Sequence, residues 1–122
     1  VRAVFDWELA TLGDPLADLG WLVASWGRPG DSVPATLAGP SMVEGWPGRE
    51  ELVARYAERS GRDVADLDFY VAFARWRSSC IGAGVYSRYA GGVMGSAEDA
   101  GALAARLEAF HTQAQAAYDA LA

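Results

Sequence analysis

Apolar residues recur at helical spacing in four segments of this 122-residue chain, and this periodicity predicts a mainly α-helical fold. Alanine is abundant, β-branched residues are sparse, and long stretches contain no proline, all of which favours helix over sheet. The chain is long enough for one domain with a hydrophobic core and too short for two. We therefore expect a single helical domain over residues 1–122 with about four helices.

The ends of the first two helices are marked by capping residues. Asp14-Pro15 begins the first helix, because Asp can accept hydrogen bonds from free backbone N–H groups and Pro suits the first helical position. Its apolar stripe ends at Trp26, before a Gly- and Pro-containing break. The second helix is expected over 50–60, with Gly61 as its C-cap. Its side chains predicted to face inward are Leu52, Val53 and Tyr56, and those predicted to face outward are Arg55, Glu58 and Arg59.

The third helix begins at Asp66 or Asp68 and runs to Tyr89. Its apolar residues cover more than one face, so we expect a central and mostly buried helix. The last helix begins near Ser96–Asp99, a string that resembles a capping box. Its buried face is expected to carry Leu103, Leu107, Phe110, Ala114 and Ala117.

Two segments fall outside this helical pattern. Val1 to Phe5 reads as a short strand that ends at Asp6. Residues 28–47 are rich in Pro, Gly and Ser and form a long loop, a kind of segment that is often functional. The chain begins with Val rather than Met, and the strand has no lead-in, so we expect a piece cut from a longer protein.

The charge of the chain excludes some classes of partner, and its cysteine content indicates a compartment. The net charge is −6, all ten basic residues are Arg, and there is no Lys. This balance argues against a nucleic-acid partner and against binding to an anionic membrane. No apolar run approaches the ~20 residues of a membrane span. The single cysteine, Cys80, cannot form an internal disulfide, which favours a cytoplasmic location.

A possible metal ligand follows the first apolar run. Asp6 is placed at the expected strand end, and Glu8 lies two residues further on. Taken alone, Asp6 reads as an ordinary turn residue. Asp14 has a sufficient explanation as an N-cap. Asp18 lies one turn into an apolar helix, where burying an unpaired carboxylate would be costly.

Two sequence segments bear on whether Asp6 is a metal ligand, because they resemble a known family: AVFDWELATLGDPLADLGWL (3–22) and WPGREELVARYAERSGRDVADLDFYVAFARWR (46–77). The first closely resembles the segment after the catalytic loop in the aminoglycoside phosphotransferase-like family. The second resembles a branch of it that includes domains joined to acyl-CoA dehydrogenases. The resemblance runs from Val1 to about Tyr89. It implies the C-terminal helical subdomain of a protein-kinase-like α+β fold.

The resemblance also implies roles for several residues. Asp6 matches the aspartate that holds the Mg²⁺ bridging the phosphates of ATP. Asp18 matches an aspartate that braces the catalytic loop, and without that loop it would be exposed or unsatisfied. Glu8 either assists the metal through water or braces its own loop, and both readings stay open. By the same resemblance, Arg75 and Trp46 lie near the acceptor pocket, although a solvated or salt-bridged Arg75 is the simpler reading.

Other parts of the family's machinery are absent from these residues. There is no His-Gly-Asp loop, and the phosphate-contacting Lys of the nucleotide-binding lobe has no counterpart. The lone His111 reads as a surface or partly buried structural residue and Cys80 as a small core residue, whereas Gly82-x-Gly84 lies in a helical pattern rather than after a strand. We therefore expect no catalytic residue in the chain and no turnover by the chain alone.

Two hypotheses follow. The chain is the C-terminal portion of an ATP- and Mg²⁺-dependent phosphotransferase that acts on a small-molecule hydroxyl. Alternatively, it is a non-catalytic helical interaction module or a pseudo-kinase remnant. In the second case apolar surface around Trp21, Trp26 and Trp76 would pair with a missing lobe or with another copy.

Overall fold

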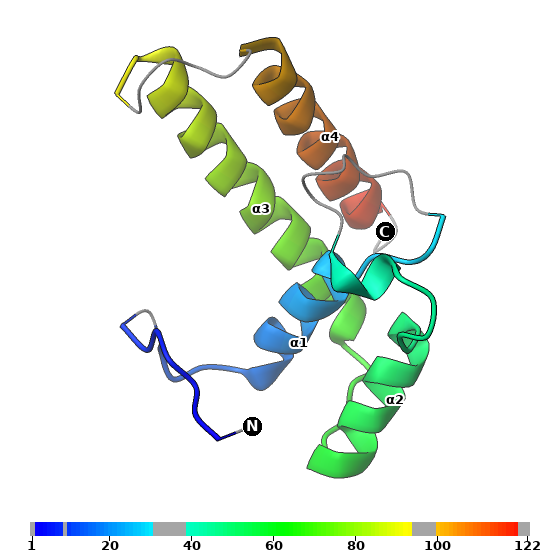
Figure 1. Cartoon of the computed structure of the whole chain (residues 1–122). Helices are drawn as coiled ribbons and strands as arrows, with labels where there is room; N and C mark the ends of the chain where they lie inside the picture. The colour runs from blue at the N-terminus through cyan, green and yellow to red at the C-terminus, as the bar shows by residue number, and fades with distance from the viewer. Residues whose placement is uncertain (1, 9, 31–38, 94–99, 120–122) are drawn as a thin grey trace.

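The computed structural model describes residues 2–8, 10–30, 39–93 and 100–119, and this part of the chain is mainly helical (Figure 1). It contains α1 (Pro15–Ser25), the short 3-10 helix η2 (Pro40–Met42), α2 (Arg49–Ser60), α3 (Leu67–Ala90) and α4 (Ala100–Asp119). Helix α3 contacts both α1 and α4, and α1 also contacts α2. The prediction of about four helices is confirmed for the described residues.

Helix α1 begins as its capping residues predict. The Asp14 side chain accepts a hydrogen bond from the backbone N–H of Leu16, with 2.9 Å between N and Oδ1. Pro15 occupies the first turn, where its missing N–H costs nothing. Leu19 and Val23, one turn apart, are buried. The N-cap role of Asp14 and the apolar stripe of this helix are therefore confirmed.

Helix α2 also matches its pattern. Gly61 follows it in the left-handed conformation with φ 67°, and its N–H donates to the carbonyl of Ala57. Glycine adopts this conformation without the steric cost that a Cβ brings. The three predicted inward side chains of α2 are half-buried and the three outward ones are exposed. The inward side chains pack on a small core of Leu19, Val23 and Leu67, together with Leu16, Val64 and Val71.

Helices α1 and α3 approach each other closely at Gly20. A Cβ added to Gly20 would lie 2.7 Å from the backbone carbonyl carbon of Tyr70, a distance that real Cβ atoms do not show. The absence of a side chain at Gly20 therefore lets the two backbones touch. Beside this contact, the guanidinium of Arg77 lies 4.9 Å from the ring centre of Trp21 in a cation–π arrangement.

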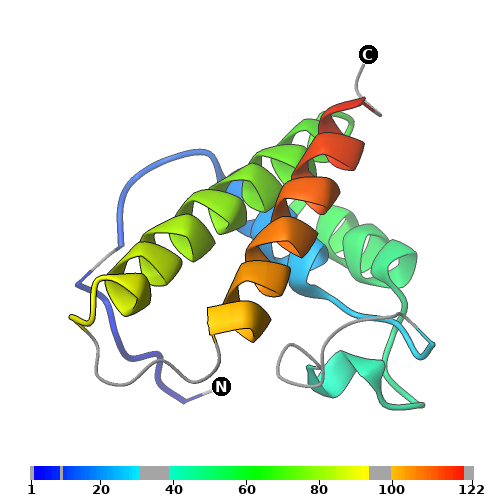
Figure 2. The ribbon, with the colours of Figure 1, turned by 90° about the horizontal axis from the view of Figure 1, so that it is seen from above.

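Helices α3 and α4 are arranged differently. Both ribbon views show them close together near the C-terminal end of α4 and separating toward the connection between them (Figures 1 and 2). Leu107 and Ala114 of α4 are half-buried, as predicted. The expected capping box at 96–99 and the side chains of Leu103, Phe110 and Ala117 lie outside the described part of the structure.

Two predictions need correction. The described residues Arg2 to Phe5 form no strand, because a strand needs a neighbouring strand to bond with and no described residue pairs with this segment. The prediction of a mostly buried α3 is also wrong: Phe69, Phe73, Trp76 and Ile81 are about half exposed, and Cys80, expected in the core, is exposed as well. Only the sides of α3 that meet α1 and α4 are covered, and the sector between them is open.

The described parts of the long loop, residues 28–30 and 39–47, pack against the end of α1. The indole N–H of Trp26 donates to the carbonyl of Pro47 at 2.9 Å, and its ring meets Trp46 edge-on at 5.8 Å between centres. The Arg49 side chain donates to the carbonyl of Trp26, and Arg28 pairs with Glu50. None of the described helices has the length and apolarity needed to span a bilayer.

Candidate functional site

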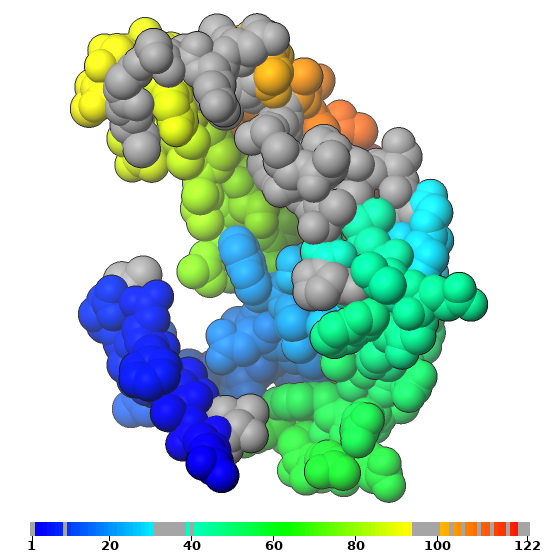
Figure 3. All heavy atoms as spheres, in the orientation of Figure 1, coloured from blue at the N-terminus to red at the C-terminus, as the bar shows by residue number. Residues whose placement is uncertain are grey.

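The segment that carries Asp6 is a turn held by its own side chains. The indole N–H of Trp7 donates to the carbonyl of Val4 at 2.7 Å, and the N–H of Ala10 donates to the carbonyl of Trp7 at 2.9 Å. Asp6 lies inside this turn with φ 70°, and among the described residues it alone adopts a positive φ without being glycine. Asp is one of the few residues that tolerate this conformation, and such outliers are common at functional sites. Figure 3 shows the segment in dark blue at one edge of the molecule.

The carboxylates of this turn face solvent. Asp6 and Glu8 are both exposed, and no described residue hydrogen-bonds to either side chain. Within the described residues, no three His, Cys, Asp or Glu side chains gather closely enough to hold a metal ion. Mg²⁺, however, keeps several waters and commonly takes only one or two protein carboxylates together with phosphate oxygens. The turn therefore fits a contributor of one or two ligands and does not fit a complete metal site.

Asp14 links the start of α1 to α3. Its Oδ1 atom accepts from the Leu16 N–H, and its Oδ2 atom accepts from the Tyr70 hydroxyl at 2.7 Å. These two hydrogen bonds, the one from Leu16 foremost, hold the pKa of the Asp14 carboxyl below its ordinary value. The same contact raises the pKa of Tyr70. The sequence identified the cap but gave no signal for Tyr70, which lies 56 residues away.

Asp18 is exposed on the first turn of α1. No hydrogen bond or ion pair joins its side chain to any described residue. The costly burial considered from the sequence does not occur, because the α1 face that carries Asp18 points away from the core. An exposed carboxylate at this position is free to accept hydrogen bonds from another segment.

Arg75 and Trp46 lie on different elements. Arg75 is half-buried on α3, and burial lowers the pKa of its guanidinium, helped by the positive charge of Arg49. Trp46 is half exposed and packs edge-on against Trp26. Neither residue lines the apolar hollow described next.

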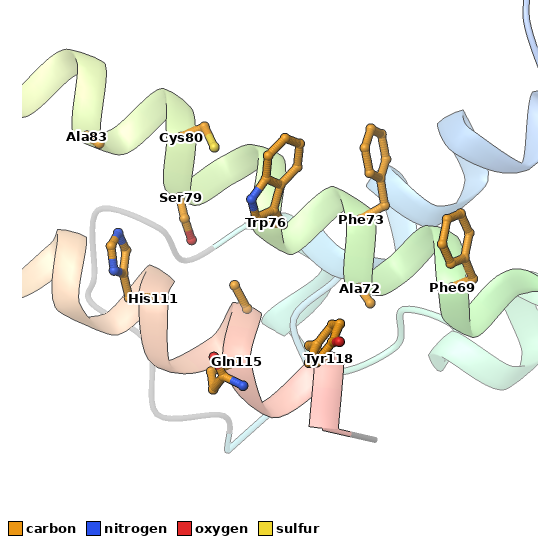
Figure 4. A pocket seen from close by; sticks show the side chains of 11 residues that line it. Phe69, Ala72, Phe73, Trp76, Ser79, Cys80, Ala83, His111, Gln115 and Tyr118 are labelled. Carbon is orange, nitrogen blue, oxygen red and sulfur yellow. The ribbon is translucent and has the colours of Figure 1, made fainter. Parts of the chain in front are cut away.

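An apolar hollow lies between α3 and α4, and we call it the α3–α4 groove (Figure 4). Its volume is about 780 Å³. Figure 4 shows the rings of Phe69, Phe73 and Trp76 on one side of α3 and Tyr118 on α4. The described residues that line it include no Asp, Glu, Lys or Arg: Phe69, Ala72, Phe73, Trp76, Ser79, Cys80, Ala83, His111, Ala114, Gln115 and Tyr118.

The groove is the feature that the sequence analysis missed, since it assigned the aromatic residues of α3 to a buried core. A signal was present in their spacing. Phe69, Phe73, Trp76 and Cys80 follow one another at intervals of four, three and four residues, which places them on one stripe of the helix. Such a stripe can pack inside the same chain or against another one, and the sequence does not distinguish the two.

Comparison with known proteins identifies the class of the chain. The model of the phosphotransferase enzyme family matches residues 1–73, which include the Asp6 turn, α1, α2 and the first part of α3. The chain belongs to this family.

Its curated relatives agree with the branch that the sequence resembled. Acyl-CoA dehydrogenase family member 11 of Rattus norvegicus is 39% identical over 93 residues, covering 73% of this chain. Acyl-CoA dehydrogenase family member 10 of Mus musculus is 38% identical over 102 residues, and Probable acyl-CoA dehydrogenase IBR3 of Arabidopsis thaliana is 31% identical over 103, each covering 80% of this chain. The matched region spans 12%, 9% and 12% of the three relatives' lengths, respectively. No solved structure matches the chain.

Proposed function

We propose that this chain is the C-terminal helical portion of a protein-kinase-like phosphotransferase that moves the γ-phosphate of ATP to a small-molecule hydroxyl. The observation that carries the proposal is the match of the family model over the segment in which Asp6 adopts its unusual backbone conformation. We keep the cytoplasm as the expected compartment.

Within that enzyme, Asp6 would hold Mg²⁺, with Glu8 beside it. The metal would neutralise charge on the phosphates of bound ATP. The turn closed by Trp7 and Val4 would fix the direction of the Asp6 carboxylate, so that less order has to be gained on binding. Asp18 would accept backbone hydrogen bonds from a catalytic loop supplied by another segment. The helices around Arg75 and Trp46 would shape the acceptor pocket.

The test measures phosphotransfer by the full-length product of the gene that encodes this segment. ADP release is followed with a panel of small hydroxyl compounds, and Mg-ATP binding is followed by calorimetry. We expect Asp6→Ala to weaken Mg-ATP binding and to lower kcat by about 100-fold or more, since a metal ligand supplies several kcal/mol. Asp68→Ala, which removes another exposed carboxylate on α3, is the control and should change neither quantity.

Unchanged binding and turnover in Asp6→Ala would overturn the assignment of Asp6. Absence of both ATP binding and phosphotransfer in the unsubstituted protein would instead favour the second candidate, the non-catalytic interaction module. The observation that supports this second candidate is the α3–α4 groove, an apolar surface whose role the phosphotransferase chemistry does not explain.

A further inference from the structure

We propose that the α3–α4 groove is the docking site for a second copy of this chain, so that two α3–α4 helix pairs pack face to face. The proposal does not depend on the phosphotransferase role. Four aromatic side chains of the groove are 43–68% exposed, namely Phe69, Phe73, Trp76 and Tyr118. Large exposed apolar patches on a small protein mark interaction sites.

The groove has the form that accepts helices. On α3 its residues recur at intervals of four, three and four, and on α4 His111, Ala114 and Tyr118 recur at three and four. These intervals keep side chains on one seam, where a facing helix can insert its own side chains between them. Both walls of the groove are helices with such seams. The side chains on the seams of one copy can therefore pack between those of the other copy.

The charge of the groove permits a second copy as its occupant. The chain has a net charge of −6, so two copies repel unless they meet on an uncharged face. The groove supplies such a face, since none of its described lining residues is Asp, Glu or Arg.

The exposed charges of the two helices also complement each other. Arg77, whose guanidinium lies over the Trp21 ring, and Arg88 are exposed on α3 and lie eleven residues apart, whereas Glu108 and Asp119 have the same spacing and exposure on α4. A two-fold axis along the groove places α3 of one copy over α4 of the other, so the helix that carries the two arginines faces the helix that carries the two carboxylates, twice over. The alternative axis, across the groove, would bring like charges together.

The surface available is of the right order. Aromatic side chains bury roughly 150–250 Å² each, so the exposed fractions of the four rings leave on the order of 450 Å² per copy for a partner. A stable complex buries about 800 Å² per partner. The rings therefore supply more than half of that area, and the remaining walls of the groove add to it.

Sedimentation equilibrium of the 122-residue chain over a wide concentration range tests the proposal. We expect a monomer–dimer equilibrium, and we expect Phe73→Asp to raise the dissociation constant about 30-fold or more, as loss of a central aromatic anchor does. The matched control is Phe5→Asp, which makes the same change at an exposed phenylalanine outside the groove and should leave the constant unchanged. Circular dichroism checks that each variant keeps its helices.

A pair of charge reversals tests the arrangement. Glu108→Arg should weaken the dimer about 5-fold, and adding Arg88→Glu should restore it, because the proposed arrangement brings α3 of one copy over α4 of the other. If the second reversal weakens the dimer further, α3 does not lie over α4 of the other copy and this arrangement is overturned.

Cys80 gives a measurement that needs no substitution. It is exposed in the single chain and lines the groove, so its rate of thiol labelling should fall as the concentration rises through the dimerisation range. A monomer at all concentrations, or a dimer that Phe73→Asp leaves intact, overturns the proposal and assigns the groove to a different occupant.

Discussion

The two long sides of α3 differ in how they are packed. Toward α1 the backbones touch at Gly20 and Tyr70, and Leu67 lies in a core with Leu19 and Val23. Toward α4 the helices separate along their length and leave aromatic rings half exposed. We call the side of α3 that packs on α1 its closed side, and the stripe of exposed aromatic residues beside the contact with α4 its open side.

The two sides of α3 therefore have different roles: one stabilises the folded chain, and the other is available to bind a partner. The closed side holds the apolar core of Leu19, Val23 and Leu67, whereas the open side, although Ala72 and Ser79 are buried there, exposes aromatic area that gains free energy only when something covers it. Substitutions on the closed side should thus change the free energy of unfolding. Comparable substitutions on the open side should leave the unfolding of the monomer almost unaffected.

The largest effect is expected for Leu19→Ala. Leu19 lies in the centre of the small core, so its truncation loses buried area and leaves a cavity, at a cost of about 3 kcal/mol in the free energy of unfolding. Leu12→Ala is the control, because Leu12 is fully exposed, and its effect should stay within about 0.5 kcal/mol. Urea unfolding followed by circular dichroism measures both.

If Leu19→Ala costs no more than Leu12→Ala, the contact between α1 and α3 does not carry the stability of the chain. The claim that the closed side of α3 stabilises the folded chain would then be wrong.

The next largest effect on the free energy of unfolding is expected for a glycine at the contact between α1 and α3, compared with a glycine on the exposed part of α3. Gly20→Ala should destabilise the chain by about 1–3 kcal/mol, because the new methyl group meets the Tyr70 backbone and forces α1 away from α3. Gly84→Ala makes the same change on α3, where no described atom outside the neighbouring turns of the same helix lies within 4 Å of the added Cβ. There the gain in helix propensity should stabilise the chain by about 0.5–1 kcal/mol.

Opposite signs for the two glycine variants, measured by urea unfolding at low protein concentration, would sharpen the contrast. Equal signs would mean that the helices can shift at Gly20 without loss, and that the approach of α1 to α3 is not tight.

Local signals explain why much of the fold was predictable. Asp14, Pro15 and Gly61 act through neighbouring backbone atoms, so their roles can be predicted from the sequence alone. The exposure of Phe73 and Trp76 depends instead on how far α4 lies from α3, which no pattern within one helix specifies. The expected strand failed for a related reason, since a strand is defined by a partner that the residues themselves do not supply.

The candidate site was predictable to a lesser degree. The sequence singled out Asp6 and Asp18 through a family resemblance, and the structure adds the positive φ of Asp6 and the exposure of Asp18. The hydrogen bond between Asp14 and Tyr70 was not predictable, because it joins residues far apart in the chain. The two residues meet only because α1 packs on α3.

That hydrogen bond gives the smallest of the expected effects, since it is exposed to water, which screens the interaction between the two side chains. The pKa of Asp14 is lowered in the folded chain, so the unfolded chain binds the extra proton first as the pH falls. The stability that Asp14 contributes is present above its ordinary pKa of about 4 and is lost as the pH falls through the lowered value. The raised pKa of Tyr70 has the opposite sense: its contribution is present below the ordinary value and is lost as the pH rises through the raised one.

Urea unfolding at about pH 6 and about pH 3 measures the acidic window. Asp14→Asn keeps an oxygen that can cap α1 but removes the charge, so the loss of stability between the two pH values should become smaller. Tyr70→Phe should reduce the same loss by a smaller amount, because the hydrogen bond from Leu16 lowers the pKa of Asp14 more than the one from Tyr70 does. If Tyr70→Phe reduces it more than Asp14→Asn, the link between α1 and α3 does not act through Asp14, and the closed side of α3 is held by its apolar contacts alone.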